Sequence, residues 1–305
     1  MRYPSSRNKT EHSKAVFAVG VVSILWGTTW LASKVGVEHI PPLQLSGLRH
    51  FIGGGLYVIY FATFRKMLPQ KHQLWQIFWM AILMFVISNA FSVLSVKYMP
   101  SGIGAVIGAI MPIWVVLFTG MAFTKVKFKA KTMVGIGLGF LGVMVTFIDF
   151  IEHIRHTDFS LGILFGLLAS IAWALATLFT AKQAKEMDPY FSLGWQMFVS
   201  GILLTTFSIA TGEFVPLAEV PVPAWLSIAY LVLIGSVIAF GAYIYALKRL
   251  PTALVAVHSY INPIVAIILG NMLMKEKLTV FIVLGTLITL WGVYLVNKSF
   301  KKVNS

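Results

Sequence analysis

Residues 250–275 of this chain are LPTALVAVHSYINPIVAIILGNMLMK, and a related segment, MPSGIGAVIGAIMPIWVVLFTGMAFT, occupies residues 99–124. Aligned without gaps, both segments have a proline at the second position, Pro251 and Pro100. Both have another proline 12 residues later, Pro263 and Pro112. The two segments also share alanine, valine, isoleucine and methionine residues at matched positions. The chain therefore contains an internal repeat.

Each repeated segment is a long apolar run with a proline near its middle. Inside a bilayer such a run must be helical, and the proline removes one backbone hydrogen bond from the helix. A helix interrupted at the same place in two halves indicates a transport site at the repeat interface. We therefore predict that Pro112 and Pro263 act as hinges. The alternative is that each is a tolerated membrane proline with a packing role.

Composition places the chain in a membrane. It has 305 residues, of which 58% are hydrophobic and 11% charged, and its mean hydropathy is +0.85. A soluble domain of this size could not bury so much apolar side chain. The net charge of +14 does not indicate nucleic-acid binding, because the basic residues form short clusters between apolar runs. The basic N-terminal segment precedes a run that we expect to be a retained span, not a cleaved signal.

The apolar runs predict an all-α integral membrane protein with ten transmembrane helices. We place the spans at residues 15–33, 43–64, 74–95, 101–124, 132–150, 160–180, 191–211, 223–246, 252–274 and 278–297. If the N-terminus is cytoplasmic, 18 of the 24 lysines and arginines lie in inner segments and five in outer ones, with Arg49 inside a span. This bias predicts that both termini are cytoplasmic.

The repeat extends over both halves of the chain. At a constant offset of 147, residues 15–56 match residues 162–203 at nine positions, including Trp26 with Trp173 and Pro42 with Pro189. We predict a tail at 1–14, five-helix repeats at 15–150 and 160–297, and a tail at 298–305. Because each half has an odd number of spans, the second is inserted upside down. Inverted repeats of this kind place a substrate site near the midplane, between the halves.

The matched tryptophans Trp26 and Trp173 lie near the middle of their spans, where an indole N–H needs a partner from protein, water or substrate. With Trp30 and Thr177 they predict two helices that face a central cavity. Helix packing, with threonines bonded to their own helix, is the alternative. Polar faces on the third, eighth and ninth spans supply further candidates for the substrate site, Asn89, Tyr243, Tyr260 and Asn262.

Arg49 and His258 are the candidates inside the spans for handling charge. Arg49 is about two turns into the second span. It could bind a carboxylate or phosphate of the substrate, pair with Glu38, or extend to the outer interface. His258, in the ninth span, could take up a proton during transport or act as a neutral hydrogen-bonding group. We expect Glu276, between Lys275 and Lys277, to form an ion pair.

The sequence disfavours an enzyme. It has no paired intramembrane aspartates, no HExxH or GxSxG pattern and no phosphate loop. We predict no catalytic residues, no metal ligands and no cofactor. The expected partners are a small-molecule substrate and the lipid bilayer, without nucleic acid. The sequence leaves open the coupling to protons and the oligomeric state.

Five-plus-five inverted spans, SILWGTTW from Ser23 and INPIVAIILGNMLMKEKL from Ile261 resemble the EamA family of the drug/metabolite transporter superfamily. The resemblance covers nearly all of residues 15–297. It implies an inner-membrane carrier that exports amino acids or other small metabolites, with a central cavity between the halves. Other interpretations are a multidrug or nucleotide-sugar carrier of the same fold and, from another class, a membrane scaffold or lipid-processing protein.

Overall fold

The structure, a computed structural model, describes residues 6–122, 130–154, 156–183, 187–250, 255 and 258–301, and this part of the chain is helical without strands. The first half contains α1 (Ser6–Val37), α2 (Pro42–Thr63), α3 (Lys71–Met80), η1 (Ala81–Ala90), α4 (Phe91–Tyr98), α5 (Ser101–Ala109), α6 (Met111–Ala122) and α7 (Ala130–Thr146). A 3₁₀ turn, η2 (Ile148–Phe150), and α8 (Ile151–Ile154) follow. The second half contains α9 (Thr157–Gln183), α10 (Pro189–Ala210), α11 (Val222–Tyr230), η3 (Leu231–Ala239), α12 (Phe240–Leu247), α14 (His258–Met274) and α15 (Val280–Lys301).

Several of these helices are suited to a bilayer. Six stretches are long and apolar enough to cross one, namely residues 11–37, 71–98, 101–119, 157–180, 189–210 and 222–247. Three shorter apolar helices cover 130–146, 258–274 and 280–296. The helix α2 is not among these nine because Arg49 and His50 lower its mean hydropathy. The all-helical class is therefore clear from the structure, while the total of ten spans remains a prediction.

The two matched mid-span prolines have different effects on their helices. Before Pro112 the helix is interrupted: α5 ends at Ala109, and α6 begins at Met111. Pro263 instead lies inside α14, which continues through it. Residues 251–254, which include Pro251, lie outside the described residues. The helix is thus broken at Pro112 and continuous at Pro263, and the hinge role of both prolines remains a prediction.

The third and eighth predicted spans share an unusual backbone. In both, a π-helical segment joins two α-helices: η1 connects α3 to α4, and η3 connects α11 to α12. Neither segment contains proline, so the cause is not a missing backbone donor. Wide π turns often mark functional sites because they reorient the side chains of the helix. Asn89 of η1 and Gly235 of η3 both lie near the cavity described below.

The helices α2 and α10 approach one another closely along glycine faces. A Cβ added to Gly54 would collide with the backbone of Phe198, and one added to Gly201 would collide with the backbone of Phe51. Only a residue without a side chain permits this contact, as in other membrane helix pairs. The contacts are reciprocal, because Gly54 and Phe51 each lie 147 positions before Gly201 and Phe198.

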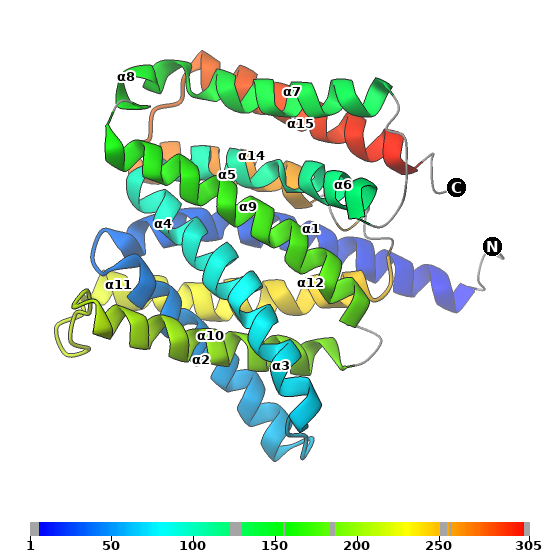
Figure 1. Ribbon diagram of the computed structural model, residues 1–305, viewed down its shortest axis with the longest axis vertical. Coiled ribbons are helices and arrows are strands. Elements are labelled where there is room, and N and C mark those ends of the chain that lie inside the picture. The colour runs from blue at the N-terminus through cyan, green and yellow to red at the C-terminus, as the bar shows by residue number, and fades with distance from the viewer. Residues whose placement is uncertain are drawn as a thin grey trace.

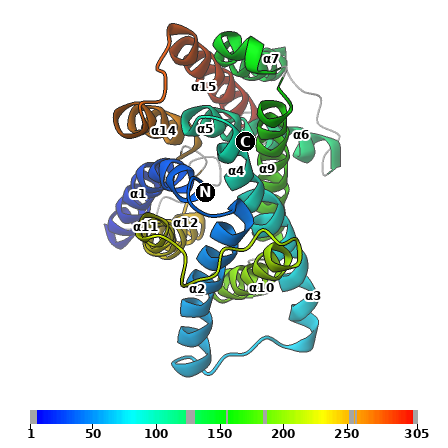
Figure 2. The ribbon, with the colours of Figure 1, turned by 90° about the vertical axis from the view of Figure 1, so that its left-hand side faces the viewer.

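A second pair, α7 and α15, packs in the same manner at the edge of the molecule (Figure 1). Gly142 approaches Thr289 and the carbonyl of Gly285, and Gly292 approaches the backbone of Gly135 and Gly139. Gly135 and Gly139, four residues apart on α7, therefore lie at this close helix contact. Seen along the helices in Figure 2, α2 with α10 and α7 with α15 lie at opposite ends of the molecule.

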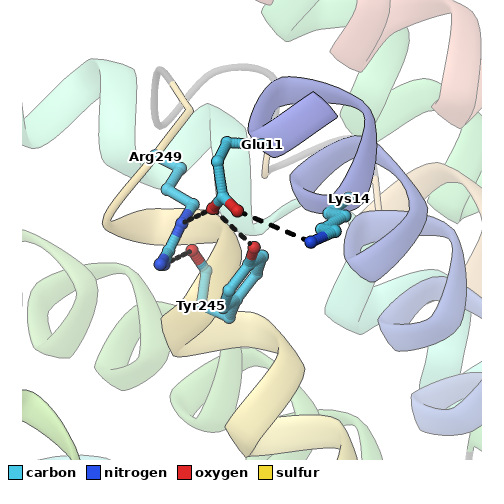
Figure 3. A network of polar contacts seen from close by, with 4 residues as sticks. All are labelled: Glu11, Lys14, Tyr245 and Arg249. Atoms are coloured by element: carbon cyan, nitrogen blue, oxygen red, sulfur yellow. Dashed lines mark hydrogen bonds and ion pairs between the residues drawn. The ribbon is translucent and has the colours of Figure 1, made fainter. Parts of the chain in front are cut away.

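Between these two pairs, α1 packs on α14 and α12, and α9 packs on α4, η1, α5 and α6 (Figure 2). The first part of α1 also meets the end of α12 in a polar network (Figure 3). The carboxylate of Glu11 accepts hydrogen bonds from Tyr245 Oη at 3.0 Å and Arg249 Nε at 3.1 Å, and pairs with Lys14 at 3.6 Å. The start of α1 and the end of α15 lie on the same side of the molecule, at the right in Figure 1.

Candidate functional site

A cavity of about 120 Å³ lies between the two halves of the chain. Helices of both halves contribute to its wall: α1, α2, η1, α4, α5 and α6 from the first, and α9, α12 and α14 from the second. Its polar lining consists of hydroxyls, amides, one histidine and one arginine, supplied by Thr29, Ser33, Arg49, Ser88, Asn89, Ser92, Ser170, His258, Ser259 and Asn262. Its aromatic lining is Trp26, Trp30, Trp173 and Phe240.

The matched tryptophans meet at this cavity. The rings of Trp26 and Trp173 pack edge to face, with centroids 5.4 Å apart and an interplanar angle of 89°. Phe240 packs on Trp26 at 4.9 Å. The indole N–H of Trp26 donates to the carbonyl of Gly235 at 3.3 Å, so its partner is protein. This bond fixes the ring, because a buried donor loses free energy when it has no acceptor.

Arg49 lies in the cavity wall with only 5% of its surface exposed. Its Nε donates to Ser236 Oγ at 3.0 Å. No ion pair to Glu38 is present in the described part of the chain, and the burial of Arg49 excludes extension to the interface. Both structural alternatives for Arg49 are therefore corrected: α2 directs the guanidinium inward, towards η3, instead of along the helix to the outer surface.

His258 and Asn262 are one turn apart on α14, and both line the cavity. His258 is buried against Trp26, and its Nδ1 hydrogen-bonds the carbonyl of Val255 at 2.9 Å. In the orientation that its neighbours require, the amide nitrogen of Asn262 donates to the carbonyls of Ser23 at 2.7 Å and His258 at 3.0 Å. The amide thus links α14 to α1 next to Pro263, which is how membrane helices tolerate an internal proline.

Two predicted residues of the first half also line the cavity. Trp30 packs over Gly104 and Gly108 of α5, where larger side chains would collide with the indole. Asn89 donates to the carbonyl of Met84, five residues earlier, as the wide π turn allows. Both side chains therefore have defined positions beside Arg49 and Trp26 in the wall.

Three predicted residues do not line the cavity. Thr177 bonds the carbonyl of Trp173 on its own helix at 2.8 Å, as in the packing alternative. Tyr243 is 3% exposed and packs beneath Trp26 and His258. Tyr260 packs in the apolar cluster formed by α5, α7 and α15. Sequence reasoning identified polar helices here, but it did not resolve which face of each helix meets the cavity.

Other lining residues were not singled out as candidates from the sequence. Ser33 follows Trp26, Thr29 and Trp30 at helical spacing, so extending the face of α1 that carries the tryptophans would have found it. Ser170 precedes Trp173 by one turn and accepts from Trp114 Nε1 at 3.0 Å. Phe240 and Ser259 carry no comparable signal, because apolar and small residues are common on every face of a membrane helix.

Glu276 lies away from the cavity and forms no ion pair among the described residues. Its carboxylate accepts hydrogen bonds from Ser101 N at 2.7 Å, Ser101 Oγ at 3.1 Å and Gly102 N at 3.3 Å. These are free donors in the first turn of α5, where the helix dipole also favours an anion. The expected ion pair is therefore wrong, and Glu276 caps a helix of the other half.

The sequence profile of the EamA-like transporter family matches residues 13–148 and residues 160–298. The chain belongs to this family. EamA-like proteins are transporters, and the multiple apolar helices of this chain agree with a membrane location. The family resemblance stated from the sequence is thereby confirmed.

Relatives of the chain within the curated proteins are transporters too. The chain is 28% identical to the uncharacterized transporter YoaV of Bacillus subtilis, over 95% of this chain and 98% of YoaV. It is 28% identical to the uncharacterized inner membrane transporter YedA of Escherichia coli, over 86% and 83% of the two chains. It is 24% identical to a probable amino-acid metabolite efflux pump of Escherichia coli, over 90% and 92%.

Proposed function

We propose that this EamA-like chain is a secondary transporter that exports small metabolites, amino acids foremost, by alternating access. One observation carries the proposal: a polar and aromatic cavity lies where the halves meet, with Trp26 and Trp173 in contact at its wall. The proposal takes Trp26, Trp30, Arg49, Asn89, Trp173, His258 and Asn262 as the residues that contact the substrate. The name of the related efflux pump supports amino acids as the substrate class.

The proposed architecture is ten spans in two inverted five-helix repeats, residues 15–150 and 160–297. Three observations support it. The family profile matches two successive stretches of similar length. The α2–α10 contact is reciprocal, since Gly54 meets Phe198 and Gly201 meets Phe51. The π-helical segments η1 and η3 occupy equivalent places in the two halves. An interruption at Ile110, before Pro112, then supplies one hinge of the transport cycle.

The orientation can be tested directly because the chain contains no cysteine. We propose that both termini are cytoplasmic, as the lysine and arginine bias predicts. Single-cysteine variants at exposed loop positions, Glu213→Cys and Arg65→Cys, would be labelled in whole cells with an impermeant maleimide. We expect labelling at 213 from outside and at 65 only after permeabilisation. The reverse pattern would refute this orientation.

The size of the cavity favours a small metabolite over a drug or a nucleotide sugar. Pockets that enclose drug-sized ligands measure about 300–1,000 Å³. The cavity here is about 120 Å³, and Trp30, packed against α5, limits its extension. A carrier is also favoured over a scaffold, because a scaffold does not require a polar cavity lined by both halves.

Counterflow in proteoliposomes tests the function. Purified protein would be reconstituted into liposomes loaded with unlabelled amino acids, and uptake of labelled amino acids would be measured with and without a pH gradient. Saturable uptake of a subset, above protein-free liposomes, is expected. A cooperative thermal-unfolding transition would show that the purified protein is folded. If such protein exchanged none of the amino acids, amino-acid transport would be refuted.

A further inference from the structure

The buried arginine of the cavity has a single hydrogen-bonded partner in the described residues. Arg49 Nε donates to Ser236 Oγ at 3.0 Å, and the described contacts give its two terminal nitrogens no carboxylate. A guanidinium carries five N–H donors and keeps its charge in proteins. A charge inside a membrane protein is costly unless it is paired, so an unpaired one at a cavity indicates a functional role.

The guanidinium of Arg49 is held in place by η3. A Cβ at Gly235 would lie 2.9 Å from Nη2, so the glycine lets the guanidinium lie close against the π-helical backbone. The carbonyl of the same glycine accepts from the indole of Trp26 at 3.3 Å. One short segment, Gly235 and Ser236, thus positions both Arg49 and Trp26. Because the guanidinium of Arg49 is already held in place, it loses less conformational entropy when a planar anion binds to it.

The rest of the cavity supplies no negative charge. Among the described residues its lining contains hydroxyls, two amides, His258 and aromatic rings, but neither aspartate nor glutamate. Arg49 is therefore the only permanently charged side chain of the described lining. An organic cation would meet uncompensated repulsion here, whereas an anionic group would neutralise the arginine.

We propose that Arg49 binds the carboxylate of the transported substrate, so that the site accepts small organic carboxylates and discriminates against the corresponding amides and amines. Carboxylate geometry matches the guanidinium fork in a bidentate pair. The inference rests on the proposed transport function but goes further, since it assigns the recognised group and excludes substrates that carry only positive charge.

The test compares substrates that differ only at the carboxylate. Wild-type protein in proteoliposomes would be given each amino acid that supports counterflow, with its carboxamide, its decarboxylated amine and its phosphonate as competitors. We expect the acid to compete at least tenfold better than the amide and the amine. The phosphonate arm distinguishes a carboxylate site from a general anion site: equal or better competition by the phosphonate would overturn the assignment to carboxylates.

Variants then test whether the preference for the carboxylic acid depends on Arg49. Arg49→Gln should lose the preference for the acid, and Arg49→Lys should retain part of it, because lysine keeps the charge without the fork. Ser236→Ala should weaken acid binding less than Arg49→Gln does. Arg65→Gln, at an exposed loop position, is the matched control and should behave as wild type. A folded Arg49→Gln protein that still prefers acid over amide would overturn the proposal.

Binding is measured separately from transport so that the two proposals can fail independently. The thermal-unfolding midpoint of detergent-purified protein would be followed with the standard amino acids, short 2-oxo carboxylates and their amides. Exchange in which acid and amide compete equally would refute the role of Arg49 and leave the transporter proposal intact. Stabilisation by carboxylates without exchange would refute transport and leave the site intact. No stabilisation by any carboxylate would overturn the carboxylate site.

Discussion

Trp26 and Trp173 are 147 positions apart in the chain, and their rings meet edge to face 5.4 Å apart. They occupy matched positions in the two halves. Their contact lies in the wall of the cavity. Edge-to-face aromatic pairs contribute about 0.5–1.5 kcal/mol beyond their burial, which is small enough to form and break in a transport cycle.

We expect Trp173→Ala to impair transport more than folding. The indole supplies one wall of the cavity and one partner of Trp26. Its removal should lower the transport rate at limiting substrate about tenfold, equivalent to ~1.4 kcal/mol, because the bound substrate loses an apolar surface. Initial counterflow rates at several substrate concentrations measure this loss.

Trp291→Ala is the matched control for that variant. Trp291 lies on α15, is 59% exposed and is not among the residues that line the cavity. We expect it to change the counterflow rate little. Equal losses in the two variants would mean that tryptophan removal acts through general stability, and the role of Trp173 at the cavity would be rejected.

Gly54→Ala should destabilise the protein, whereas Gly20→Ala should not. A methyl group at Gly54 collides with the backbone of Phe198, and backbone cannot move aside as a flexible side chain can. Overpacking of this kind costs about 1–3 kcal/mol. A methyl group at Gly20 meets nothing within 4 Å, and alanine favours the helix.

The two glycine variants are compared by thermal unfolding in the same detergent. A lower midpoint for Gly54→Ala, with Gly20→Ala equal to or above wild type, is the expected result. Equal midpoints for both variants would show that α2 and α10 separate easily, and the reciprocal contact would not hold the halves together.

The helical character and most helix limits were predictable because apolar runs of membrane length can only be helices. The residues of η1 and η3 lie within these apolar runs, so their helical state was predictable, but their π-helical geometry was not. A π turn holds one more residue than an α turn, and tertiary packing decides whether it forms. Neither segment carries a proline as a local signal. Whether a helix breaks or continues at a proline also depends on tertiary contacts, and at Pro263 the neighbouring Asn262 bonds to a carbonyl of α1.

The candidate site was predictable where a residue type is costly in lipid. Trp26, Arg49 and His258 stood out for this reason, and all three line the cavity. The match between the two halves of the sequence was a weaker predictor of the residues that line the cavity. Gln196 matches Arg49 in the repeat, yet it bonds Ser192 on its own helix at 2.6 Å and lies outside the main cavity. Residues matched in sequence therefore differ in their surroundings, and the cavity lining is asymmetric.

Glu276→Gln should lower stability by about 1 kcal/mol, the usual contribution of a helix N-cap. The carboxylate accepts three hydrogen bonds from Ser101 and Gly102 and carries a charge that the dipole of α5 favours. The amide keeps the shape but loses the charge and one acceptor. Thermal unfolding of the purified variant measures the change.

Glu11→Gln is a useful comparison for the Glu276 variant. Glu11 also joins two helices, through Tyr245 and Arg249 (Figure 3), but its ion pair with Arg249 is partly open to solvent, with side-chain exposures of 44% for Glu11 and 36% for Arg249. Exposed ion pairs are screened by water and salt, so we expect a much smaller shift of the midpoint. A larger shift for Glu11→Gln than for Glu276→Gln would contradict the capping role.

His258→Gln should remove the dependence of transport on external and internal pH. The described lining contains no aspartate or glutamate, and histidine is the residue type whose ordinary pKa is nearest to neutral pH, so His258 is the candidate for proton coupling there. Its Nδ1 is held by the carbonyl of Val255, which leaves Nε2 as the nitrogen that gains or loses a proton. Glutamine retains hydrogen-bonding capacity without titrating. Counterflow and gradient-driven uptake between about pH 5 and 8 would be compared for the two proteins. A variant with an unchanged pH profile would exclude His258 from coupling.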